Sequence, residues 1–470
     1  MEEDMNPQVQ PVTKTEVFPK VFSTPQKEII TEPTPKIDPF ENEMSKFVYY
    51  RTYSRWDDAK GRRETWDETV QRCVTFLKKA SKNKLKKSDY ELIHQYILEM
   101  KVMPSMRLLW TAGKPADINN VAIYNCSTVP IDSLGSFGEV YFLLMSGTGV
   151  GVDVSKRYVE KIPKVKKLNG EKKTIVFDDS KEGWAVGTME VCQAMWEGLD
   201  VDWDLSKLRP QGARLKTFGG RSSGPGPLDE TLHFIKHMVE AHRDRKLSSI
   251  NAFDIITKIA NSVVVGGVRR SSIITLSDLY DNGMRDAKQG QFWVTNAHRA
   301  MSNNSAIYDS KPNSIEFMKE WLALAESGTG ERGIFNRYSI NSLIPKRRRK
   351  RQDWTTNPCG EIILRPRGFC NLTEVVIRAE DTLETLMEKI KVATLIGTIQ
   401  STMTNFSLLD DLHEDWKKNA EEERLLGVSM TGQMDNPDVL TEDNLQALRD
   451  YSIGVNVETA ERLKINRSVA

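Results

Sequence analysis

Residues 355–374 read TTNPCGEIILRPRGFCNLTE, and the interpretation of the whole chain starts from this stretch. Cys359 stands between a proline and a glycine. Proline fixes φ and glycine tolerates unusual dihedrals, so we expect Cys359 on a tight loop. Asn357 and Glu361 lie two residues to either side, where an extended backbone points side chains the same way. The stretch predicts an amide, a thiol and a carboxylate around one spot, which suits thiol chemistry with a general base.

A second cysteine, Cys370, follows 11 residues after Cys359. The alternative interpretation is a buried loop with two inert cysteines, because free cysteine is among the most buried residue types. The packing of Asn357, Cys359 and Glu361 around one Pro-Gly turn favours a reactive site.

The composition excludes several classes of protein. The 470 residues are 39% hydrophobic with a mean hydropathy of −0.47, which predicts a soluble chain with a sizeable core. No apolar run is long enough to span a membrane, and the N-terminus lacks the apolar core of a secretory signal. A net charge of +1 favours neither nucleic acid nor membrane as a partner. Five scattered cysteines without a Cys-x-x-Cys pair, and six dispersed histidines, predict no disulfide framework and no metal site, and we expect a cytoplasmic protein.

The N-terminal part divides by composition. Residues 1–45 are predicted to be a disordered tail, because seven prolines and few large apolar groups occur in the first 40 positions. Residues 46–118 are predicted to be a helical region. One helix begins after Thr65 and carries Cys73 on an apolar face with 3.6-residue spacing, so this cysteine is assigned to the core. The same spacing assigns Cys192 to the core.

The motif Asn-Pro-Cys-Gly-Glu at 357–361, followed by Cys-Asn-Leu at 370–372 and Glu374, resembles the finger loop of ribonucleotide reductase large subunits. Residues 54–70 are similar to the start of the monomeric, coenzyme-B12-dependent (class II) enzymes. The resemblance implies an α/β fold, the ten-stranded reductase barrel around a central finger loop, over residues 119–470.

The resemblance covers about residues 46–470, which corresponds to roughly the first two thirds of the family's catalytic domain. The Pro-Ser-Gly-Thr loop and the C-terminal cysteine pair of the family do not occur in this sequence. We therefore expect an incomplete barrel and a second polypeptide that completes it. A split gene, an intein-interrupted precursor and a truncated chain remain open.

The resemblance also implies roles for individual residues. Cys359 would carry the thiyl radical, Glu361 would act as general base, and Asn357 would hold the ribose hydroxyl. Cys126, which taken alone would be a core residue, and Cys370 would supply two electrons and end as a disulfide. Ser105 and Asn125 match positions that contact substrate.

Two glycine-containing segments carry further predictions. Residues 146–154, SGTGVGVDV, resemble a glycine-rich phosphate loop, but no acid follows them at the spacing of a dinucleotide-binding fold, so their glycines are assigned to close backbone packing. The resemblance implies that a loop with Gly266, Gly267, Arg269 and Arg270 links a dNTP effector to substrate choice. The alternative for this loop is a plain connection with two solvated arginines. The basic run at 346–351, KRRRKR, is interpreted as a solvated loop.

The implied cofactor is adenosylcobalamin, and the implied partners are a ribonucleotide substrate, a dNTP effector and a thioredoxin-like dithiol reductant. Triphosphate substrates are favoured over diphosphates by the similarity to the monomeric enzymes. Two alternatives stay open: a class I large subunit that acts on diphosphates with a radical-generating small subunit, and an inactive fragment or intein flank.

Overall fold

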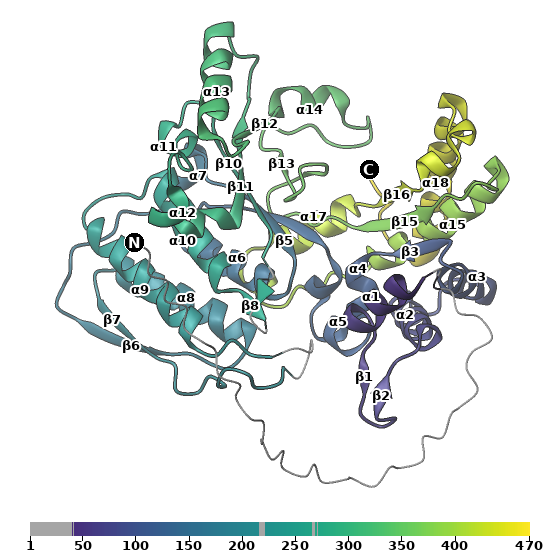
Figure 1. Cartoon of the computed structure of the whole chain (residues 1–470), viewed down its shortest axis with the longest axis horizontal. Coiled ribbons are helices and arrows are strands. Elements are labelled where there is room, and N and C mark those ends of the chain that lie inside the picture. Colours follow the sequence, from purple (N-terminus) through teal and green to yellow (C-terminus); the bar gives the residue numbers. More distant parts are fainter. Residues whose placement is uncertain (1–39, 41, 216–220, 266–267, 270) are drawn as a thin grey trace, which may run out of the picture.

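A computed structural model describes residue 40 and residues 42–215, 221–265, 268–269 and 271–470. Two groups of elements lie side by side (Figure 1). One holds a five-stranded sheet with helices α8, α9 and α10, and the other holds a three-stranded sheet with helices α15 and α18. The predicted tail falls mostly outside the described residues, although positions 43–45 already belong to the first helix.

The N-terminal region, residues 43–123, is mostly helical, as the sequence predicts. Helix α2 begins at Trp66 because Thr65 forms a capping box: its hydroxyl oxygen accepts from the Glu68 amide, and the Glu68 carboxylate accepts from the Thr65 amide. Cys73 lies on the buried face of this helix and is fully enclosed. The elements are α1 (Glu43–Thr52), β1 (Trp56–Asp57), β2 (Arg62–Arg63), α2 (Trp66–Ala80), α3 (Lys87–Leu98), β3 (Val102–Pro104), α4 (Met106–Thr111), α5 (Lys114–Ile118) and the 3-10 helix η1 (Asn120–Ile123).

The larger sheet is entirely parallel, in the order β12-β11-β10-β5-β4. Its inner strands are almost wholly buried, as expected of parallel strands covered on both faces. The strands and the elements between them are β4 (Cys126–Pro130), α6 (Gly135–Met145), β5 (Gly149–Asp153), α7 (Lys156–Val159), α10 (Ser249–Ser262), β8 (Val264–Val265), β9 (Val268–Arg269), β10 (Ile273–Asp278), α11 (Asn282–Arg285), α12 (Phe292–Thr295), the 3-10 helix η2 (Ala297–Met301), β11 (Ser302–Ile307), α13 (Ser314–Ser327) and β12 (Gly333–Phe335).

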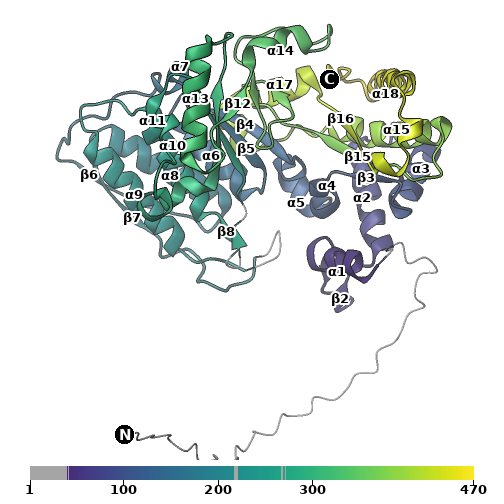
Figure 2. The same cartoon turned by 45° about the horizontal axis from the view of Figure 1, so that its top comes forward.

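A lobe with a small sheet of its own is inserted between α7 and α10 and shares the main hydrophobic core. Its parallel pair, β6 and β7, makes a two-stranded sheet of its own and packs with two long helices (Figure 2). The elements are β6 (Lys172–Val176), α8 (Lys181–Trp196), β7 (Asp200–Asp204) and α9 (Gly226–Ala241). Cys192 lies fully buried in α8, as predicted.

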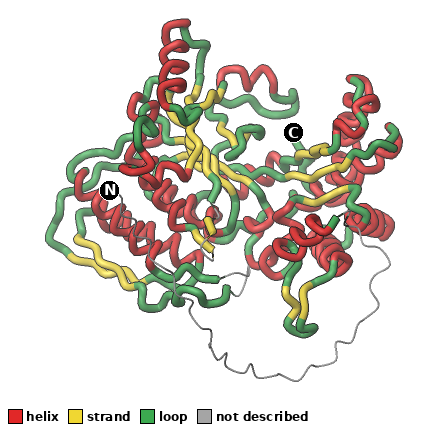
Figure 3. Tube along the Cα trace, in the orientation of Figure 1, coloured by secondary structure: helices red, strands yellow, loops and turns green. Residues whose placement is uncertain are grey.

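The smaller sheet has the order β16-β15-β3, with β15 and β16 parallel and β3 antiparallel to β15. The chain reaches it through the short hairpin β13–β14, visible between the two groups in Figure 3. The elements are α14 (Arg337–Leu343), β13 (Thr355–Thr356), β14 (Ile363–Leu364), β15 (Leu372–Val376), α15 (Leu383–Gln400), α16 (Leu408–Leu412), α17 (Asp415–Glu423), β16 (Gly427–Thr431), the 3-10 helices η3 (Gln433–Asp435) and η4 (Pro437–Val439), and α18 (Glu442–Leu463).

The predicted α/β class is confirmed by this parallel sheet and its helices. The described residues form five strands in one sheet and three in the other, so the ten-stranded barrel stays a prediction. Among the described residues, no helix is long and apolar enough to cross a membrane.

Candidate active site

The motif at 357–361 forms the tip of the β13–β14 hairpin. Thr355 pairs with Leu364 and Thr356 with Ile363, and the connecting turn closes where the Gly360 amide donates to the Asn357 carbonyl over 3.0 Å. Gly360 has φ +84°, a value that favours glycine. The Cys359 side chain is exposed at this tip. The sequence prediction of a cysteine on a tight loop therefore agrees with the backbone geometry.

The amide and the carboxylate of the motif contact each other directly. Asn357 is fully buried, and its Nδ2 donates to Glu361 Oε1 over 2.8 Å. Its Oδ1 accepts from the Ile362 amide over 2.9 Å, which fixes the orientation of the side chain. Glu361 itself is exposed. The arrangement holds an acceptor carboxylate at the hairpin tip, next to the thiol of Cys359.

Cys126 and Cys370 come together although they are far apart in the sequence. Cys126 starts β4, and its carbonyl accepts from the Cys370 amide over 2.9 Å. The two side chains are free thiols joined by a hydrogen bond, and the Asn357 side chain also bonds to Cys126. The hydrogen bond from Cys370 lowers the pKa of Cys126, against the effect of burial, and Asn357 lowers it further. The bond to Cys126, together with burial, raises the pKa of Cys370 well above its usual value.

Cys359 behaves differently from Cys126. Burial raises its pKa, and the charges of Glu361 and Cys126 raise it further. The thiol of Cys359 therefore stays protonated at neutral pH. Cys126 pairs with Gly149 on β5, and Gly149 lies against Pro358, the residue before Cys359, so the backbone brings the hairpin tip close to the Cys126–Cys370 pair.

Strand β5 packs closely against the hairpin, and two of its glycines lie at the contact. A Cβ on Gly151 would lie 1.9 Å from the Thr356 carbonyl oxygen, and one on Gly149 would lie 2.9 Å from Pro358 Cγ. Glycine is required here because the hairpin backbone approaches the strand too closely for any side chain. The glycine-rich segment therefore packs against the hairpin in the way the sequence predicts.

The two residues predicted to contact substrate, Ser105 and Asn125, differ in whether their side chains already form hydrogen bonds within the protein. The Ser105 hydroxyl caps α4, accepting from the Leu108 amide over 3.1 Å and donating to the Ile123 carbonyl over 3.4 Å. The side-chain oxygen of Asn125 is buried and has no hydrogen-bond partner among the described residues. Asn125 therefore has an unused acceptor, whereas the Ser105 hydroxyl already caps α4; their contacts with substrate stay predictions.

The predicted effector loop is described only in part. Gly266, Gly267 and Arg270 lie outside the described residues. The backbone of Arg269 belongs to β9, which pairs with β8 as an antiparallel hairpin in the register Val264–Arg269. The role of this loop remains a prediction.

Buried arginines around the hairpin were not recognised as site residues from the sequence. Arg348, in the basic run interpreted as a solvated loop, is 7% exposed, lies over the Trp354 ring and binds Glu423 in a bidentate pair. Arg365 also pairs with Glu423, at 3.1 Å. A run of like charges gives no signal for burial, and Glu423 is too distant in the sequence to indicate the pairing.

Comparisons with known proteins show which family this chain resembles. The model of the ribonucleotide reductase alpha domain matches residues 26–114. A crystal structure of a B12-dependent (class II) ribonucleotide reductase is similar, with a TM-score of 0.76 and 22% sequence identity. The matched region covers 90% of this chain and 71% of the reductase chain in that crystal structure. The chain is therefore similar to the ribonucleotide reductase family in its N-terminal sequence and in its fold.

Within that family it is similar to the B12-dependent members. The insertion-domain model of B12-dependent ribonucleotide reductase matches residues 158–239, the lobe with β6 and β7, which the sequence analysis did not separate from the barrel. Relatives named adenosylcobalamin-dependent ribonucleoside-triphosphate reductase include those of Lactobacillus gasseri, 26% identical over 93% of this chain, and Euglena gracilis, 30% identical over 83%. The chain spans 67% of the first relative and 55% of the second.

Proposed function

We propose that this chain carries the catalytic centre for the reduction of ribonucleoside triphosphates to 2′-deoxyribonucleotides, using a thiyl radical on Cys359 and the dithiol of Cys126 and Cys370. The observation that supports it is geometric: the Cys370 amide bonds to the Cys126 carbonyl over 2.9 Å, and Gly149, the strand partner of Cys126, lies against Pro358 next to Cys359. A buried pair of inert cysteines would need neither the exposed third thiol nor the adjoining Asn–Glu pair.

The chemistry divides among these side chains as follows. A Cys359 sulfur radical removes the hydrogen atom from C3′ of the ribose, and Glu361 takes the proton of the 3′-hydroxyl. The C2′–OH bond then breaks, and the hydroxyl leaves as water with a proton from the dithiol. Cys126 and Cys370 supply two electrons and their second hydrogen, which becomes the new hydrogen on C2′, and they end as a disulfide. Glu361 returns its proton to the 3′-oxygen, and Cys359 returns its hydrogen atom to C3′. One substrate and one dithiol therefore give one deoxynucleotide, one disulfide and one water.

The protonation states of the thiols support these roles. A hydrogen-atom donor must be a neutral thiol, and the raised pKa of Cys359 keeps it neutral. The dithiol works best when one sulfur readily becomes a thiolate while its partner retains a proton. The lowered pKa of Cys126 and the raised pKa of Cys370 correspond to this division.

The residues present also fit the implied cofactor, adenosylcobalamin. The cofactor supplies, when bound, the carbon-centred radical that takes the hydrogen atom of Cys359. A large cofactor can reach only an exposed thiol, and Cys359 is the exposed cysteine among the described residues. The hairpin tip would therefore face the cofactor, while Asn357 and Glu361 would face the ribose. The insertion-domain match favours this cofactor over a class I radical subunit.

The free acceptor of Asn125 would bind a substrate hydroxyl, and Ser105 would contact substrate from the start of α4. The loop with Gly266, Gly267, Arg269 and Arg270 would couple a dNTP effector to substrate choice. A thioredoxin-like dithiol would reduce the disulfide by thiol exchange. The attack would fall on Cys126, because Cys370 is only 1% exposed.

We also propose that a second polypeptide, expected from the sequence, adds strands to the edges of the two sheets. Within the described residues β12 pairs only with β11, and β16 pairs only with β15, so each leaves an edge. Ile334 on β12 is 56% exposed. Unpaired edges with apolar side chains are sites for strand addition. Co-expression with a polypeptide equivalent to the remaining third of the relatives should give a stoichiometric complex and slow amide exchange in β16; unchanged exchange would refute this part.

The activity is tested with that complex, adenosylcobalamin, a ribonucleoside triphosphate and dithiothreitol. We expect deoxynucleotide formation, which Cys359→Ser abolishes. Cys73→Ser is the matched control, because Cys73 is buried in α2 and should leave turnover within about twofold. Turnover by the Cys359→Ser variant above background would remove the assigned role. Turnover only with a radical-generating subunit and diphosphates would support the class I alternative, and no turnover in any combination would support an inactive fragment.

A further inference from the structure

The position of Cys370 opposite Cys126 depends on a short piece of strand pairing. Residues 367–370 run antiparallel to β4: the Arg367 amide donates to the Thr128 carbonyl over 3.0 Å, and the Thr128 amide donates to the Gly368 carbonyl over 3.1 Å. Ser127 faces Phe369 in this register. The pairing therefore sets Cys370 directly across from Cys126.

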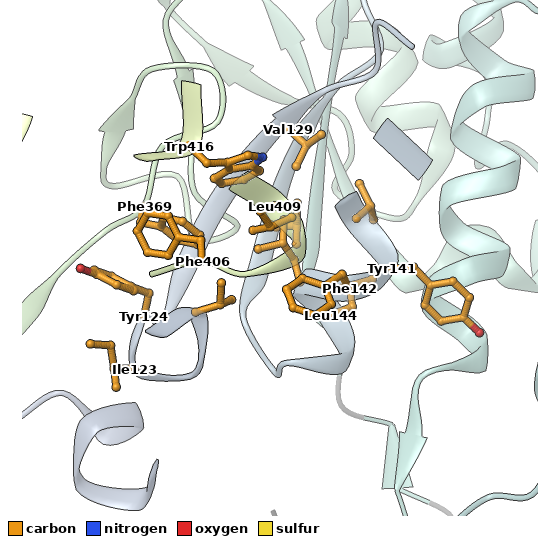
Figure 4. Packing of buried hydrophobic residues seen from close by; sticks show 14 of the residues in the cluster. Ile123, Tyr124, Val129, Tyr141, Phe142, Leu144, Phe369, Phe406, Leu409 and Trp416 are labelled. Carbon is orange, nitrogen blue, oxygen red and sulfur yellow. The ribbon is translucent and has the colours of Figure 1, made fainter. Parts of the chain in front are cut away.

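This register decides whether the two thiols meet. Side chains alternate between faces along an extended segment, so a slip of one residue would place Cys370 on the opposite face. On this side of β4, opposite β5, only these few described residues pair with the strand, and so short a ladder holds its register weakly unless something at its end fixes it. Phe369 helps to choose the face, since it packs on Tyr124, Phe406 and Trp416 (Figure 4).

Arg367 fixes the position of the segment along β4. Arg367 is 3% exposed, and its guanidinium donates through Nε to Glu139 Oε1 over 2.9 Å, and through Nη2 to Glu139 Oε2 over 3.0 Å and Asp132 Oδ1 over 2.8 Å. Asp132 lies just after β4, and Glu139 lies in α6, the helix that follows it. The side chain at the start of the paired segment is thus tied to the same β4–α6 unit whose first residue is Cys126.

The partners of Arg367 are themselves held in place. Glu139 is 1% exposed, and its Oε1 also accepts from Trp416 Nε1 over 2.8 Å. Asn419, from the same helix α17, donates to the Pro366 carbonyl over 2.8 Å. A planar guanidinium bound to two fixed carboxylates allows little sliding, because its donors must match both acceptors at once.

We propose that Arg367 is a positioning residue that locks the register of residues 367–370 on β4 and so keeps the Cys370 sulfur against that of Cys126. The alternative is that the ion pairs only stabilise the fold and that the aromatic packing of Phe369 sets the register. Arg367 has φ +58°, so the alternative can also invoke a backbone preference at this position.

The proposal rests on the proposed dithiol role for its functional meaning, but its test needs no turnover. The equilibrium constant for the Cys126–Cys370 disulfide is measured in oxidised and reduced dithiothreitol buffers, with the linked peptides identified by mass spectrometry. In Arg367→Gln we expect it to fall at least about tenfold, which is about 30 mV for a two-electron couple. Asp132→Asn, which removes one partly exposed partner, should give a smaller fall in the same direction.

Two further variants separate the proposal from its alternatives. Arg337→Gln breaks one buried pair, with Asp153, and one partly exposed pair, with Asp309, but Arg337 has no recorded bond to the 367–370 segment among the described residues, so the disulfide constant should stay within about twofold. Arg367→Gly retains the left-handed backbone without the guanidinium and should behave like Arg367→Gln. Retention of the wild-type constant in Arg367→Gly, or an equal fall in Arg337→Gln, would overturn the proposal; if Arg367→Gln does not fold, an unchanged constant in Asp132→Asn overturns it.

Discussion

Replacing Glu423 by glutamine should destabilise the base of the finger hairpin. Glu423 Oε1 and Oε2 accept from Arg348 Nε and Nη2 over 2.7 and 2.9 Å, and Arg365 Nε lies 3.1 Å from Oε1. Arg348 precedes the hairpin and Arg365 follows it, so one carboxylate holds both ends. Arg348 Nη1 also donates to the Ile363 carbonyl over 2.9 Å.

The magnitude follows from burial. The side chains of Glu423, Arg348 and Arg365 are 3%, 6% and 7% exposed, so the variant leaves two buried guanidinium groups without their shared counter-charge. Removal of one partner of a buried ion pair costs about 3–5 kcal/mol. Glutamine keeps the shape and one acceptor oxygen, so we expect a loss near the lower end, about 3 kcal/mol.

The matched control is Glu422→Gln, one residue away on the same helix. Glu422 is 49% exposed and has one contact, to Arg365 Nη1 over 2.7 Å, so the loss should stay below about 1 kcal/mol. Urea unfolding followed by tryptophan fluorescence measures both variants, because Trp416 lies in α17 and Trp354 lies under Arg348. A loss below about 1 kcal/mol for Glu423→Gln, or equal losses for both variants, would refute the reasoning.

Three further predictions concern the site and its packing. Alkylation of Cys126 by iodoacetamide should persist to lower pH than that of an ordinary thiol, because its pKa is lowered and its thiolate survives acidification, whereas alkylation of Cys359 should rise only at higher pH; peptide mass spectrometry follows both. Gly151→Ala should displace the hairpin, since its Cβ would lie 1.9 Å from the Thr356 oxygen, whereas Gly454→Ala, with open space in α18, should be neutral or stabilising by up to about 1 kcal/mol; thermal unfolding distinguishes them. Phe369→Ala should cost about 3–5 kcal/mol in urea unfolding, because it empties a buried aromatic cluster; a loss below about 1 kcal/mol would contradict that packing.

Helix caps, apolar helix faces and tight turns were predicted correctly, because each depends on residues close together in the sequence. The capping box at Thr65 and the buried face with Cys73 follow from short-range spacing and agree with the structure. The tight turn at Gly360 follows in the same way. The lobe at 158–239 was not separated from the barrel, because alternating helices and strands look alike in a barrel and in an insertion.

The approach of Cys126 to Cys370 could not be worked out from spacing. It was implied by the resemblance alone, since 244 positions (370 minus 126) separate the two cysteines. The backbone bond between them forms only because the hairpin returns antiparallel to β4. The catalytic roles of these residues stay predictions, and the experiments on Cys359 and on the disulfide test them independently.

Charge was the least reliable guide to position. With 66 basic and 65 acidic residues, an arginine near the hairpin gives no indication from composition of whether it is solvated. Arg348, Arg365 and Arg367 are all buried, and each finds its carboxylate in a helix far along the chain. Buried ion pairs add little to stability compared with apolar packing, but they tolerate little displacement. A hairpin that would present a reactive thiol beside a dithiol needs this kind of restraint, so we expect replacement of an arginine together with its buried carboxylate by apolar residues to disturb thiol geometry more than stability.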